Sequence, residues 1–118
     1  IAPTFDHASS LGRELLPAKL DQWEKEDWRA EWYAKRASGA IFLRTEQKHG
    51  ENPLRLAEFI LRQRPNRVTP WLERLRGLDI AQLSAIVHRV PQALMPEQSR
   101  RFCVSLLGYT LQHLQNLK

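Results

Sequence analysis

The sequence has little of what secreted, membrane or phosphate-binding proteins need. Cys103 is the single cysteine, so no disulfide can form within the chain, and we expect a reducing location, the cytoplasm. No apolar run approaches the roughly 20 residues that cross a bilayer, and no signal peptide is visible, so we expect no membrane partner. The five glycines form no Gly-rich phosphate loop.

Side chains that could hold a metal ion or act as nucleophiles are also sparse and dispersed. The four histidines, with no second cysteine and no His-Glu-x-x-His spacing, do not predict a zinc site. No serine lies in a Gly-x-Ser-x-Gly elbow, and Cys103 is interpreted as a small buried hydrophobic residue. We therefore expect that this chain alone is not an enzyme.

What the chain does have is enough apolar material for one folded domain. Its 118 residues are 42% hydrophobic and include four tryptophans. A chain of this length buries roughly two thirds of its unfolded surface, so an ordinary core is feasible. The net charge of +5 is scattered and is interpreted mainly as solvated helix faces. Because the chain begins at Ile1 without an initiator Met, we expect it to be part of a longer protein.

The apolar spacing predicts an all-α fold, either a multi-helix bundle or the helical layer of a larger protein. No alternating strand pattern is present. Asn52 before Pro53, and Asp79 with Gln82 three residues later, are typical helix starts. The residues from which we expect the successive helices to begin are Pro17, Asp27, Pro53, Thr69, Asp79 and Pro96. Residues 1–13 are expected to be an ordered loop, and residues 14–118 a single helical region.

A basic cluster suggests one class of function, a stand-alone helical module that binds an acidic protein or RNA. The simpler interpretation is a hydrated rim around two short helices. The arginines concerned are Arg62, Arg64, Arg67, Arg74 and Arg76.

Residues 72–90 have the spacing of a helix-turn-helix. However, Glu73 stands where that motif needs a small residue, and Arg89 is the only base-reading cation of its second helix. Direct nucleic-acid binding is therefore not favoured.

The N-terminal loop suggests a different function. Asp6 follows an apolar residue in a loop that ends in Ser-Ser-Leu-Gly. Phosphoryl-transfer enzymes hold Mg²⁺ and ATP with a carboxylate on such a turn, because this hard cation prefers oxygen ligands. A single Asp in a loop is more often only a turn former.

Five short stretches of the sequence resemble HipA-type serine/threonine protein kinases, the toxin kinases of bacterial toxin–antitoxin systems. The string APTFDHASSLG at residues 2–12 resembles the metal-binding loop of that family. The string YAKRASGAI at residues 33–41 is similar to the helix after that loop. IVHRVP at residues 86–91, SRRF at residues 99–102 and Leu106-Leu107 are similar to its C-terminal helices.

The resemblance implies that Asp6 is a metal- and cofactor-binding residue, which would contact Mg²⁺ and ATP in the full-length parent. That parent would transfer the γ-phosphoryl group to a protein substrate. The nucleotide-covering loop, the phosphate-pairing Lys and the catalytic Asp lie before this region in the family, so the chain alone should be inactive and should bind no cofactor tightly. The implied partners are the rest of the kinase, a protein substrate and an antitoxin.

Overall fold

The computed structural model describes residues 11–12, 15–23 and 28–118, and these form six helices and no strand. The all-α expectation is therefore confirmed for this part of the chain. The helices are α1 (Pro17–Trp23), α2 (Arg29–Arg36), α3 (Pro53–Gln63), α4 (Pro65–Arg76), α5 (Ile80–His88) and α6 (Glu97–Gln115).

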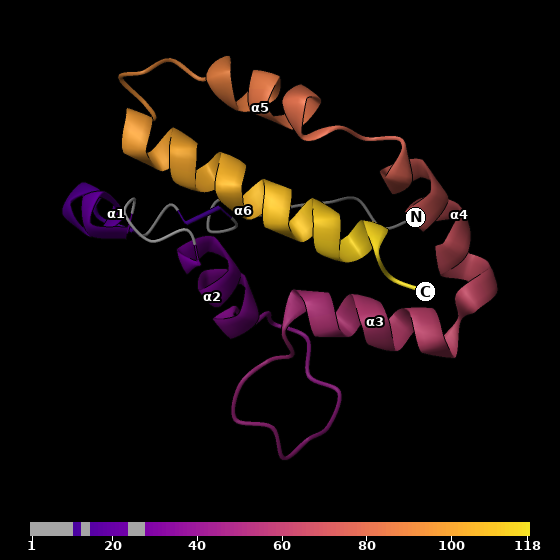
Figure 1. The fold of residues 1–118 in the computed structure, drawn as a ribbon. Helices are drawn as coiled ribbons and strands as arrows, with labels where there is room; N and C mark the ends of the chain where they lie inside the picture. Colours follow the sequence, from indigo (N-terminus) through magenta and orange to yellow (C-terminus); the bar gives the residue numbers. More distant parts are fainter. Residues whose placement is uncertain (1–10, 13–14, 24–27) are drawn as a thin grey trace.

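The C-terminal helix α6 is the centre of the arrangement. Each of the other five helices packs against it, and Figure 1 shows α5 along one side with α2 and α3 on the other. Its buried apolar residues are Phe102, Cys103, Leu106 and Leu111, and the first three share one helix face at three- and four-residue spacing. α6 thus supplies the apolar side chains around which the shorter helices pack.

The main hydrophobic core lies where α1, α2 and α3 meet α6. Its buried members are Leu20, Trp23, Ala30, Ala34, Leu54, Phe102 and Leu106. The two alanines of α2 allow that helix to approach α6 closely, since a small side chain shortens the distance between helix axes. Larger side chains at Ala30 or Ala34 would have to displace these neighbours.

Local signals at two helix starts are confirmed. The side chain of Asn52 accepts hydrogen bonds from the backbone N–H groups of Leu54 and Arg55, so it caps α3 as expected. Asp79 and Gln82 form the reciprocal capping box at the start of α5. The expected cap Asp27 lies outside the described residues.

The expected start of α4 is wrong. We expected Pro65 to end one helix and Thr69-Pro70 to open the next, but α4 begins at Pro65 and contains Pro70. Only Arg64 separates α3 from α4, and its extended φ of −141° turns the chain. Pro65 lies in the first turn of α4, where a backbone N–H has no partner within the helix, so nothing is lost. Pro70 cannot donate to the carbonyl four residues before it, but Pro70 is exposed, so water can reach that carbonyl.

A loop between α2 and α3 projects away from the helices (Figure 1). Its base is closed by two backbone hydrogen bonds, from Gly39 N–H to Glu51 O at 2.9 Å and from Glu51 N–H to Ile41 O at 2.6 Å. A Cβ atom at Gly50 would collide with the carbonyl group of Gly39, so the close approach requires glycine there. Ile41 and Phe42 are both more than half exposed in this loop.

No helix in the described part of the chain is both long and apolar enough to cross a membrane.

Candidate functional site

The predicted metal ligand Asp6 lies outside the described residues, as does His7. Within the described ranges no group of three or more His, Cys, Asp or Glu side chains could hold a metal ion. His88 lies on the surface of α5 with its Nδ1 atom 2.8 Å from the carbonyl oxygen of Ser84. His113 lies beside a glutamate.

The end of the predicted metal loop is described, and it is anchored on α6. Gly12 has a φ of 75°, which side-chain-bearing residues rarely adopt, and it is buried. A Cβ atom at this position would lie 2.6 Å from the Cε1 atom of Phe102. Conformation and space both require glycine at residue 12, so the last residue of the loop is fixed against the middle of the core.

The ring of Phe102 contacts aromatic rings from α1 and α2. The ring of Tyr33 meets it edge-on, with centroids 5.4 Å apart and an interplanar angle of 89°. The ring of Trp23 lies 5.9 Å from it. Edge-to-face pairs of this kind add about 1 kcal/mol beyond the apolar area that they bury. The stretches around residues 12, 33 and 102 are far apart in sequence and meet at this phenylalanine.

Arg100 is a buried charged residue that holds α5 and the following turn onto α6. Its guanidinium donates to the carbonyl oxygens of Met95 at 3.1 Å, His88 at 3.2 Å and Val90 at 2.5 Å. The side chain is 7% exposed, and Glu97 lies 3.9 Å away. A planar fork of N–H donors suits several carbonyls at once, which explains an arginine here. Sequence reasoning gave this residue no role, because its acceptors are backbone atoms brought together by folding.

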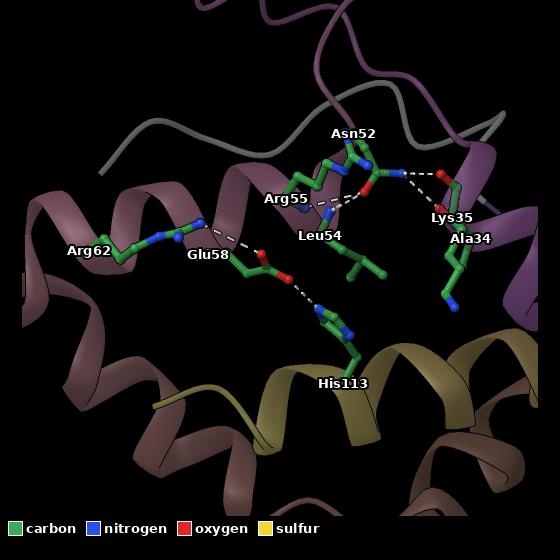
Figure 2. Close-up of polar contacts among 8 residues, drawn as sticks. All are labelled: Ala34, Lys35, Asn52, Leu54, Arg55, Glu58, Arg62 and His113. Atoms are coloured by element: carbon green, nitrogen blue, oxygen red, sulfur yellow. Dashed lines mark hydrogen bonds and ion pairs between the residues drawn. The ribbon is translucent and has the colours of Figure 1, made fainter.

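Polar contacts also connect α2, α3 and α6 (Figure 2). The side-chain amide of Asn52 reaches back to the last carbonyls of α2. On the other side of α3, the carboxylate of Glu58 lies 2.9 Å from Nε2 of His113 on α6 and 3.8 Å from the guanidinium of Arg62. These contacts fix the orientation of α3. Of them, the sequence predicted only that Asn52 caps α3.

Cys103 is fully buried, and burial raises the pKa of its thiol above the ordinary value of 9.0 because the thiolate is disfavoured away from water. A nucleophilic cysteine needs the opposite shift. The interpretation of Cys103 as a small buried hydrophobic residue is confirmed.

Tryptophans and cations share the surface of α1 and α2. The guanidinium of Arg29 lies 3.9 Å from the ring centroid of Trp28, and that of Arg36 lies 4.9 Å from the ring of Trp32. Trp28 is 49% exposed. The apolar spacing of the sequence does not indicate that these tryptophans stay at the surface beside arginine side chains.

The predicted basic cluster separates into two sets. Arg62 pairs with Glu58 on α3, and Arg76 donates to the carbonyl oxygen of Leu117 at 3.4 Å. The remaining members, Arg64, Arg67 and Arg74, accompany the exposed Trp71 on α4.

Residues 72–90, which have the spacing of a helix-turn-helix, do not form such a packed unit. α4 and α5 each pack against α6 and hardly touch each other. In a helix-turn-helix the first helix supports the second, so that the second can enter the DNA groove. In this arrangement α6 supports both helices.

No protein-family model, no curated protein and no solved structure matches this chain.

Proposed function

We propose that this chain is the C-terminal helical part of a HipA-like serine/threonine protein kinase and is inactive in isolation. The observation that carries the proposal is the meeting of three of the resembling stretches at one place in the fold. Gly12 ends the stretch 2–12, Tyr33 begins the stretch 33–41, and Phe102 ends the stretch 99–102; Phe102 contacts the other two residues.

Asp6 is the proposed ligand of Mg²⁺, and through it of ATP, in the parent kinase. The cation would neutralise charge that develops on the phosphates during phosphoryl transfer. The string that contains Asp6 ends at Gly12, and Gly12 lies against Phe102 of α6, which supports this role. The described residues offer no group of metal-binding side chains, so the proposal takes the other ligands from the nucleotide and from the preceding part of the kinase.

The residues of this chain would then have a supporting role in the reaction. Positioning and electrostatic stabilisation account for most of the catalysis of phosphoryl transfer. α6 and its aromatic contacts would hold the metal loop in place while the substrate hydroxyl and the catalytic base come from elsewhere in the parent. The protein substrate would be phosphorylated on Ser or Thr, and an antitoxin would be the regulatory partner.

The first test is the coding sequence before Ile1. The proposal expects a catalytic Asp with a nearby Asn shortly before this residue, and a nucleotide-binding lobe further back. An unrelated domain at that position would refute the proposal.

The second test uses the intact parent protein with Asp6→Asn. The substitution removes the negative charge of the carboxylate that would bind the metal, so the rate of protein phosphorylation should fall about a hundredfold or more. The matched control is Asp79→Asn, which removes the same charge from a helix cap where asparagine serves equally well. A parent that keeps its full rate with Asp6→Asn would contradict the proposed role.

A further inference from the structure

One face of α4 carries cations on both sides of an exposed indole ring. Arg67 lies four residues before Trp71 and Arg74 three residues after it, so all three project from the same side of the helix. Arg64 stands three residues before Arg67, at the N-cap position. We call these four residues the arginine–tryptophan stripe.

The stripe is turned away from the helix face that packs. Leu72 is buried, while Trp71 is 53% exposed. The guanidinium of Arg74 lies 4.9 Å from the centroid of the Trp71 ring, within the range of a cation–π contact. Arg64 and Arg67 make no ion pair or side-chain hydrogen bond with any residue that the structure describes.

The net positive charge is not scattered, as we had expected, but is concentrated on α3 and α4. Residues 53–76 hold six arginines and two glutamates, so they carry four of the five net positive charges of the chain. Neither glutamate opposes the stripe: Glu58 is paired with His113 on α6, and Glu73 is two residues from Trp71 and points to another side of the helix.

We propose that the arginine–tryptophan stripe binds an acidic peptide segment that carries one apolar anchor residue. Tryptophan and arginine are the side chains that most often dominate binding energy in protein interfaces, with an apolar anchor at the centre and polar groups around it. Here the indole lies between cations, which complements an apolar residue between carboxylates. This inference does not depend on the proposed kinase function.

The dimensions fit a short segment. Arg64 and Arg74 are ten positions apart, which is about 15 Å along a helix. An extended peptide of roughly five residues covers that distance.

RNA is less favoured as the occupant. Proteins that bind single strands offer several aromatic rings for successive bases along a continuous basic groove. The stripe offers one ring.

The test is binding of a fluorescent peptide to the whole chain, measured by fluorescence anisotropy at low and at physiological salt. The probe is a short peptide of Asp and Glu with one central Phe, compared with the same peptide carrying Ser in place of Phe. We expect salt-sensitive binding that is weaker for the Ser peptide. Arg67→Ser with Arg74→Ser should weaken binding of the Phe peptide about tenfold.

The matched control removes the same charge elsewhere, by Arg44→Ser with Arg89→Ser, two exposed arginines outside the stripe. Equal weakening by the two double variants would overturn the proposal, because only net charge would then matter. Tighter binding of a single-stranded oligo-uridine RNA than of the Phe peptide at the same salt would also overturn it. Trp71→Ala should remove the preference for Phe over Ser, and a preference that survives would refute the anchor.

Discussion

The side-chain amide of Asn52 donates a hydrogen bond of 2.8 Å to the carbonyl oxygen of Ala34, which joins the start of α3 to the last turn of α2. The same amide donates to the carbonyl oxygen of Ala37 at 2.8 Å, while its own oxygen caps α3. One buried side chain therefore satisfies backbone groups at two helix ends that face each other.

Asn52→Ala should lower the free energy of unfolding by about 3 kcal/mol, because it removes a cap and leaves buried carbonyls without donors. Asn52→Asp is the informative comparison, since aspartate keeps the cap of α3 but cannot donate to α2. Urea unfolding followed by circular dichroism measures both. If the Asp variant were as stable as the wild type, the contact with α2 would contribute nothing.

Gly12→Ala should destabilise the chain by about 2 kcal/mol, because alanine is strained at positive φ and its Cβ would press on Phe102. Gly77→Ala is a matched control: its φ is −82° and its nearest neighbour would be 3.4 Å away. That control should be neutral or slightly stabilising. Thermal unfolding of the two variants gives the comparison, and equal melting temperatures would show that Gly12 is not fixed against α6.

Arg100→Lys should lower the free energy of unfolding by about 2 kcal/mol although the charge is kept. An ammonium group cannot reach the three carbonyls that the guanidinium fork spans, and unpaired buried carbonyls are costly. The exposed Arg89→Lys should change stability by less than about 0.5 kcal/mol. Hydrogen exchange of the α5 amides would locate the effect, and protection that is unchanged in α5 would argue against this role of Arg100.

The buried thiol makes stability depend on pH in the alkaline range. Because burial raises the pKa of Cys103, the unfolded chain releases this proton at lower pH than the folded chain. The contribution to stability is complete below the ordinary value of 9.0 and is lost as the pH rises toward the raised folded value. Urea midpoints from pH 7 to pH 10 should fall more steeply for the wild type than for Cys103→Ala. Parallel curves would mean that the thiol does not titrate differently in the two states.

Features set by neighbours in the sequence were predictable. The Asn52 and Asp79 caps are recognised from residues within three positions, and the apolar period of α6 needs no knowledge of its partners. The start of α4 was missed because Pro65 both ends α3 and opens the next helix, and a proline is read from sequence as one or the other.

The contacts that hold the candidate site could not be predicted, because they join distant residues through backbone atoms or close packing. Nothing in the sequence near Arg100 indicates that the carbonyls of His88 and Val90 will converge on it. The requirement for glycine at residue 12 likewise becomes visible only when Phe102 is seen beside it. The role of Asp6 remains a prediction.

Because the base of the loop between α2 and α3 is closed, changes at the tip of the loop should not disturb the helices. Since Gly39 and Glu51 hold the two ends together, a change of length or composition around Thr45, in the turn between Arg44 and Gln47, need not be transmitted to either helix. A fluorophore or an affinity tag inserted at that tip would leave the packing around α6 intact and give a handle for isolating whatever the helices bind.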